Sequence, residues 1–208
     1  MAWGFTVTCV AGLAALLWAE TNQPTWRRPA KMVASTAFVA VALSLGAGDT
    51  SFGRWMLAGL VLSWLGDLLL TYRGRSAFLS GLVAFLLAHV AYIVAFVVRG
   101  VATPQWLFVA GMFVAGAFIL RWLWPHVDQQ MRMPVLAYVV TITVMVLVAA
   151  ATAQAEPDWR IPVGAVAFYL SDVAVARNRF VAPGVINRLW GLPLYYAAQL
   201  LFAWVAAS

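Results

Sequence analysis

Residues 76–98 read SAFLSGLVAFLLAHVAYIVAFVV, and this run decides the fold. It contains no charged residue, and its most polar side chain is His89. A helix needs about 20 apolar residues to cross the hydrocarbon core of a membrane, so the run predicts a membrane-spanning helix. Basic and turn-forming residues bound it on both sides, at Tyr72-Arg73-Gly74-Arg75 and at Arg99-Gly100, as is typical of the headgroup region.

Similar apolar runs extend in both directions along the chain. The 208 residues are 64% hydrophobic and 10% charged, whereas soluble domains are about 45–50% apolar and about 25% charged. This composition excludes a soluble globular enzyme, a disordered chain and a disulfide scaffold. We therefore predict an all-α, polytopic membrane protein that forms one integral-membrane domain over residues 1–208. Eight transmembrane helices are expected near residues 3–19, 30–46, 53–71, 76–98, 105–123, 133–152, 160–176 and 188–205.

The basic residues are divided unevenly between the two ends of these helices. One end carries ten of the 13 Lys and Arg residues, and the other carries Arg54, Arg99 and Arg160. The positive-inside rule places the richer end in the cytoplasm, which predicts an inner (cytoplasmic) membrane protein with both termini outside. Because the positive charge is spread over short loops, no nucleic-acid partner is expected. Membrane lipids are the expected partners of these residues. The ten residues are Arg27, Arg28, Lys31, Arg73, Arg75, Arg121, Arg132, Arg177, Arg179 and Arg188.

Two aspartates lie inside predicted spans. Asp67 and Asp172 each lie five residues before the residue that bounds their span, Tyr72 or Arg177, so both are expected roughly 7–8 Å below the cytoplasmic boundary. An Asp at a helix centre costs about 2.5–3.5 kcal/mol on insertion, and such residues usually face a cavity or a partner. Two such carboxyls close together would share a proton, as a general acid beside a general base. Pairing with an arginine or capping of a neighbouring helix is the structural alternative.

The surroundings of these aspartates indicate an internal duplication. Trp64-Leu65-Gly66-Asp67 resembles Tyr169-Leu170-Ser171-Asp172, and the offset between them also separates Pro29 from Pro134. Two four-helix halves, about residues 1–100 and 105–208, would place the two aspartates across the centre of the bundle.

Few other polar side chains lie within the spans. His89 is either a site residue or a neutral histidine bonded to a carbonyl. Tyr195 and Gln199 share one helix face, and Lys31 can reach a lipid phosphate. A zinc site needs about three protein ligands, which these residues lack, so no metal and no cofactor are expected.

The chain resembles the YhhN family of membrane proteins, the lysoplasmalogenases, over nearly its whole length. The resemblance rests on motifs in a specific order: Pro29-x-Lys31, Gly66-Asp67-x-Leu69-Leu70, Phe78-x-x-Gly81-Leu82-x-x-Phe85-x-x-x-His89-x-x-Tyr92, Gly164-Ala165-x-x-Phe168-x-x-Ser171-Asp172, Arg177-x-Arg179-Phe180 and Tyr195-Tyr196-x-x-Gln199-x-Leu201.

The resemblance implies hydrolysis of the vinyl-ether bond of a lysoplasmalogen. The substrates would be a lysophospholipid and water, and the products a fatty aldehyde and glycerophosphocholine or glycerophosphoethanolamine. Vinyl-ether cleavage passes through an oxocarbenium ion, and glycosidases handle a similar cation with two carboxylates. Asp67 and Asp172 are therefore the expected catalytic pair. The expected substrate-binding residues are Lys31, His89, Tyr92, Ser171, Arg177, Tyr195 and Gln199, with Lys31 and Arg177 on the phosphate.

Other classes of protein fit part of this pattern. A proton-coupled transporter of small molecules or lipids would use the same two aspartates for titration. An intramembrane aspartyl protease would use them as a dyad, and a zinc-dependent lipid amidase would need more histidines. Oligomeric state is not encoded in any feature of the sequence.

Overall fold

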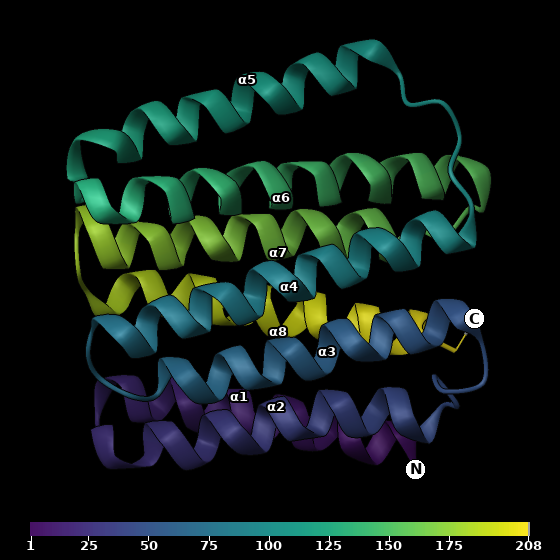
Figure 1. The fold of residues 1–208 in the computed structure, drawn as a ribbon. Coiled ribbons are helices and arrows are strands. Elements are labelled where there is room, and N and C mark those ends of the chain that lie inside the picture. The colour runs from purple at the N-terminus through teal and green to yellow at the C-terminus, as the bar shows by residue number, and fades with distance from the viewer. Residues whose placement is uncertain (208) are drawn as a thin grey trace.

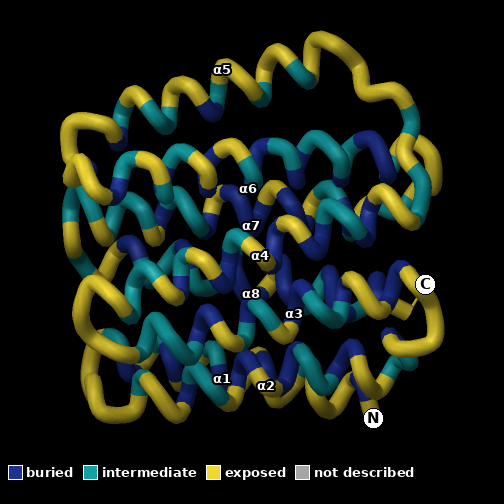
Figure 2. Tube along the Cα trace, in the orientation of Figure 1, coloured by how far each residue is buried: buried dark blue, intermediate teal, exposed yellow. Residues whose placement is uncertain are grey.

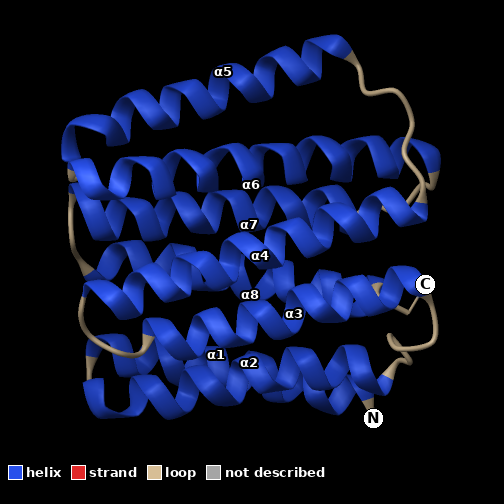
Figure 3. Cartoon of the chain, in the orientation of Figure 1, coloured by secondary structure: helices blue, strands red, loops and turns tan. Residues whose placement is uncertain are grey.

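The computed structural model describes residues 1–207 and consists of helices joined by short loops (Figures 1 and 3). The predicted all-α fold is confirmed, and each predicted span corresponds to one observed helix whose ends agree to about one turn. The helices are α1 (Ala2–Thr21), α2 (Arg27–Ser44), α3 (Ser51–Leu70), α4 (Arg75–Arg99), α5 (Trp106–Leu123), α6 (Gln129–Ala155), α7 (Arg160–Ala176) and α8 (Val185–Val205). Short 3-10 turns η1 (Pro24–Trp26) and η2 (Trp124–His126) precede α2 and follow α5, and the π-helical turn η3 (Arg177–Val181) extends α7.

The outer surface of the bundle is apolar, as expected for a chain in lipid. Five helical segments are individually long and apolar enough to cross a membrane: α1, α3, α4, α5 with η2, and α6. In α5 with η2 only 11% of the most apolar stretch is buried, compared with 56% in α6. Figure 2 shows the long exposed side of α5 at the edge of the bundle. An apolar helix exposed to this extent requires a lipid environment, so the chain is a multi-pass integral membrane protein.

Helix α8 lies inside the bundle and contacts α1, α2, α3 and α7. Neighbouring helices approach closely where one of them has a small residue. A Cβ atom on Gly66 would lie 2.6 Å from the Phe85 ring, so α3 and α4 can pack here only with glycine. Because Gly66 precedes Asp67, this close approach also fixes the depth of the first intramembrane aspartate.

Both chain ends lie at one end of the bundle (Figure 1). The loops α1–α2, α3–α4, α5–α6 and α7–α8 lie at the opposite end. These four loops and the helix ends beside them carry the ten basic residues of the sequence prediction. We refer to this as the basic end of the bundle.

An ion cluster closes the other end. Asp158, between α6 and α7, accepts two hydrogen bonds from the Arg160 guanidinium, at 2.9 and 2.7 Å. Arg99, at the end of α4, lies 3.6 Å from the same carboxylate. Partial burial acts to raise the pKa of Asp158, but the hydrogen bonds from Arg160 and the charges of both arginines hold this pKa below its usual value.

We expect Asp158→Asn to lower the unfolding temperature at pH 7 by roughly 2–4 °C, the shift that about 1 kcal/mol causes in a chain of this size. A lowered pKa in the folded state stabilises the fold above the unfolded pKa, near pH 4, and this stabilisation is lost as the pH falls further. Thermal unfolding of the purified protein in detergent at pH 7 and at pH 3.5 should therefore show the difference from wild type shrinking in acid. Glu156→Gln, an exposed neighbour, is the matched control. A difference at pH 3.5 as large as the difference at pH 7 would contradict the assignment.

Candidate active site

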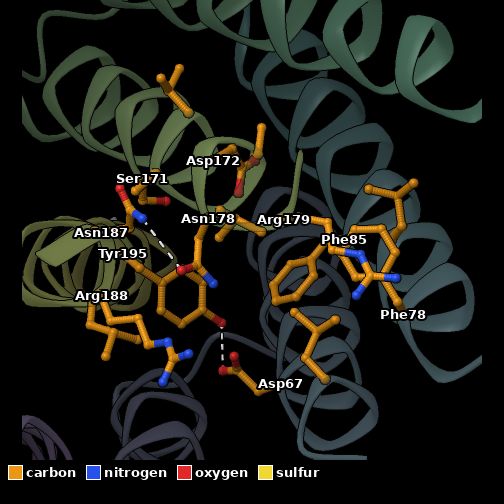
Figure 4. A pocket seen from close by; sticks show the side chains of 18 of the residues that line it. Asp67, Phe78, Phe85, Ser171, Asp172, Asn178, Arg179, Asn187, Arg188 and Tyr195 are labelled. Carbon is orange, nitrogen blue, oxygen red and sulfur yellow. Dashed lines mark hydrogen bonds between the residues drawn. The ribbon is translucent and has the colours of Figure 1, made fainter. Parts of the chain in front are cut away.

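A cavity of about 750 Å³ enters the bundle from its basic end. The wall at this end includes residues of the α3–α4 loop between Thr71 and Gly74 and of the turn η3 between Asn178 and Phe180, and these form the mouth. The inner part is lined by Asp67, Phe85, Tyr138, Asp172 and Tyr195. Another part of the cavity lies between α4, α5 and α6, and we refer to it as the apolar arm. It is lined by Leu82, Ile119, Leu123, Val135, Val139 and Ile142. Figure 4 shows Asp67 and Asp172 on opposite sides of this cavity.

Asp67 is surrounded by three hydrogen-bond donors. The Lys31 ammonium lies 2.9 Å from Oδ1, while the hydroxyls of Ser35 and Tyr195 both donate to Oδ2 at 2.6 Å. The Asp67 side chain is 2% exposed, and a charge that deep requires an opposite charge and further hydrogen bonds. Lys31 supplies the charge from α2, and Tyr195 reaches in from α8.

The donors around Asp67 are themselves held in place. The Tyr196 hydroxyl lies 3.0 Å from Ser35 Oγ and donates to the Lys31 carbonyl at 3.2 Å. The Tyr195 ring packs edge-on against Phe85 and Phe168, with ring centroids 5.8 and 5.5 Å apart. The Asp67 surroundings therefore join α2, α3 and α8 into one hydrogen-bonded unit.

Asp172 lies in α7 among different partners. The Tyr138 hydroxyl of α6 donates to its Oδ2 at 2.7 Å, and His89 Nε2 of α4 lies 3.5 Å from the same oxygen. His89 is fully buried, with its ring edge-on to Tyr138 and Phe168 at 5.2 and 4.6 Å. The nearest partners of Asp172 are thus a phenol and an imidazole, where Asp67 has an ammonium.

Five of the predicted site residues line this one cavity: Lys31, Asp67, Ser171, Asp172 and Tyr195. Ser171 Oγ donates to the Phe168 carbonyl at 2.7 Å, which occupies its proton within α7. His89 lies directly behind Asp172.

The remaining predicted residues lie outside this wall. Tyr92 and Gln199 are buried deeper, where the Tyr92 hydroxyl donates to Gln199 Oε1 at 2.9 Å. Arg177, at the start of η3, donates to Asn187 Oδ1. Among the residues that the structure describes, these three are absent from the cavity lining.

The sequence reasoning missed four polar residues of this region: Ser35, Tyr138, Glu20 and Asn187. Two of them carried a signal. Ser35 follows Lys31 by four residues and so shares its helix face, and Tyr138 is a tyrosine inside an otherwise apolar span. Glu20 and Asn187 appear in the sequence as ordinary loop or helix-end residues, and their importance depends on contacts across the bundle. Within residues 1–207, no three His, Cys, Asp or Glu side chains gather closely enough to hold a metal ion.

Ionisable side chains inside a membrane-spanning bundle mark a functional site, and here two carboxyls face one cavity. The sequence model of the YhhN family matches residues 1–206, and the chain belongs to this family.

Relatives of known name cover most of the chain. A Mycobacterium tuberculosis protein named lysoplasmalogenase is 35% identical over 188 residues, which span 86% of this chain and 68% of that protein. The mouse (Mus musculus) protein lysoplasmalogenase TMEM86B is 33% identical over 199 residues, spanning 95% of this chain and 82% of its own. Human (Homo sapiens) lysoplasmalogenase TMEM86A is 28% identical over 211 residues, spanning 96% and 85%. No solved structure matches the chain.

We expect Lys31→Met to destabilise the fold by about 3–5 kcal/mol, because it leaves the Asp67 carboxylate buried without a charged partner. The double variant Lys31→Met/Asp67→Asn should recover part of this loss, since both charges are then gone. Chemical or thermal unfolding of wild type, Lys31→Met, Asp67→Asn and the double variant in detergent measures the coupling. Losses that simply add would show that the two side chains act independently.

Proposed function

We propose that this protein is a lysoplasmalogenase that cleaves the vinyl-ether bond of a lysoplasmalogen with water, releasing a fatty aldehyde and the glycerophospho-alcohol. The names of its relatives support the activity. The observation that carries the mechanism is a single cavity with two carboxyls on opposite walls in unlike surroundings. Enzymes separate acid from base by giving similar groups different environments.

Asp172 is proposed as the acid. Tyr138 occupies its Oδ2, which leaves Oδ1 to carry a proton into the cavity. Transfer of that proton to the β-carbon of the vinyl ether converts the double bond to a single bond and leaves an oxocarbenium ion. The His89 ring lies behind Asp172, with Nε2 3.5 Å from the same Oδ2.

Asp67 is proposed as the stabilising anion. Lys31, Ser35 and Tyr195 already donate to its oxygens, so it is a poor proton acceptor. Its fixed negative charge instead lies across the cavity from the acid, where the cation develops.

Water completes the reaction. It adds to the cationic carbon and gives its proton to the Asp172 carboxylate, which restores the acid. The resulting hemiacetal collapses when the proton of its hydroxyl ends on the glycerol oxygen and the carbon–oxygen bond to glycerol breaks. The products are the aldehyde and the alcohol, and no proton is gained or lost overall.

The shape of the cavity supports one substrate orientation. The polar mouth accepts the headgroup, the two carboxyls and Tyr195 flank the vinyl ether, and the apolar arm accepts the hydrocarbon chain. The concentration of arginine at the mouth also supports the proposed topology. By the positive-inside rule the basic end is cytoplasmic, both termini are outside, and the aspartates lie near the cytoplasmic face of an inner membrane.

Asp172→Asn and Asp67→Asn should each lower aldehyde release from a choline or ethanolamine lysoplasmalogen by at least about 100-fold, the scale of acid–base and of electrostatic catalysis. The assay uses protein purified in detergent, where no membrane gradient exists for a carrier to use. Asp128→Asn, an exposed loop residue at the basic end, is the control and should retain activity. Full activity in both site variants would overturn the mechanism, and an inactive wild type would overturn the substrate.

Ile119→Trp should shift chain preference towards shorter alkenyl chains, because the larger side chain fills the apolar arm between α5 and α6. The readout is the ratio of kcat/KM for a short-chain and a long-chain lysoplasmalogen. The neighbouring Phe118 is 70% exposed on the outside of α5, so Phe118→Trp should leave the ratio unchanged. Equal ratios in wild type, Ile119→Trp and Phe118→Trp would show that the alkenyl chain of the substrate does not bind in the apolar arm.

A further inference from the structure

We propose that Asn178, Arg179 and Arg188 form a subsite for the phosphate of the lipid headgroup, and that Asn187 positions it. This inference rests on the proposed function and identifies its headgroup contacts. It differs from the sequence expectation, which assigned the phosphate to Lys31 and Arg177. Both of those side chains are engaged within the protein, Lys31 by Asp67 and Arg177 by Asn187.

The charge of the cavity wall calls for an anion. The wall carries six basic and three acidic side chains, so positive charge is in excess: Arg27, Arg28, Lys31, Arg73, Arg179 and Arg188 against Glu20, Asp67 and Asp172. Asp67 offsets Lys31, and Glu20 is shared by Arg27 at 2.9 Å and Arg188 at 2.5 Å. The excess therefore lies at the mouth and not beside the carboxyls.

Asn187 fixes the turn that carries two members of the subsite. It is 1% exposed and lies at the start of α8, where its Nδ2 donates to the Ala182 carbonyl at 2.7 Å and reaches Asn178 Oδ1 at 3.4 Å. The Gly184 N–H donates to the same Asn178 oxygen at 3.0 Å. With its oxygen held in this way, Asn178 turns its amide N–H groups towards the cavity (Figure 4).

The two arginines are oriented by other contacts. The Arg179 guanidinium stacks on the Phe78 ring at 4.4 Å, which leaves the N–H groups at its edge for a ligand. Arg188 donates from one nitrogen to Glu20, and a guanidinium has five N–H donors in total. Figure 4 shows Arg179 on one side of Asn178 and Arg188 on the other.

Two planar guanidinium groups and an amide form a donor set suited to phosphate oxygens. Because the cavity continues into an apolar arm, the anion that fits it best is attached to a hydrocarbon chain. A phosphate held at the mouth would direct that chain inward between Asp67 and Asp172. The same donors would also accept free phosphate, so the test must separate the two sources.

The test is a binding measurement with ligands that cannot be hydrolysed. A saturated 1-O-alkyl lysophosphocholine and the 1-O-alkylglycerol of the same chain length differ only in the phosphocholine group. In detergent, wild type should bind the phosphocholine ether about 10- to 100-fold more tightly. Arg179→Gln and Arg188→Gln should each bring this ratio towards one while leaving alkylglycerol binding unchanged. Arg75→Gln is the control, because Arg75 lies at the basic end but outside the cavity lining.

Asn187 is tested by the same ratio. Asn187→Ala should lower it while alkylglycerol still binds, an outcome that general loosening of the fold would not produce. Asn187→Asp keeps the acceptor for Arg177 but loses the Nδ2 donor to Ala182 and Asn178, so it should also lower the ratio, and an undiminished ratio would overturn the positioning role.

The outcomes separate this proposal from the activity. An undiminished ratio in both arginine variants overturns the subsite even if wild type releases aldehyde. A ratio that falls as expected in a protein that releases no aldehyde supports the subsite and overturns the activity. Displacement of the ether lipid by inorganic phosphate at equal concentration would assign the site to a free anion and overturn the headgroup assignment.

Discussion

The ion pair between Lys31 and Asp67 is the constraint on which the centre of the molecule depends. An unpaired carboxylate at this depth would be strongly unfavourable, so α2 must bring its ammonium to within 2.9 Å and α8 must bring the Tyr195 hydroxyl to within 2.6 Å. Close packing of α3 on α4 at Gly66 sets where the carboxylate lies. One buried charge therefore determines how four helices meet, and their meeting forms the inner wall of the cavity.

Asp172 has the same kind of side chain as Asp67 but different hydrogen-bond partners. Its partners, Tyr138 and His89, come from α6 and α4, helices on the side of the bundle away from Lys31. The cavity lies between these two polar groups and continues into apolar space beside α5. Its wall thus runs from charged to polar to apolar, which parallels the order of headgroup, ether and chain in a lysophospholipid.

The sequence predicted the helices well because a continuous apolar run has few other structures open to it. It also identified Asp67 and Asp172, since a charge within such a run is exceptional. It could not predict the partners: these helices are apolar around their circumference, so periodicity does not reveal which face meets which neighbour. From the sequence alone Lys31 is therefore expected at a lipid phosphate, and the contacts of Tyr138 and Asn187 are not predicted. The division into two four-helix halves stays a prediction.

The placement of both chain ends at one end of the bundle has a practical consequence. The N-terminus, at the start of α1, and the C-terminus, at the end of α8, both lie at the end of the bundle opposite the cavity mouth. A reporter, affinity handle or surface anchor attached at either terminus would therefore stand at the end of the bundle opposite the opening. Tethered through either end, the protein would present an unobstructed entrance to the solution.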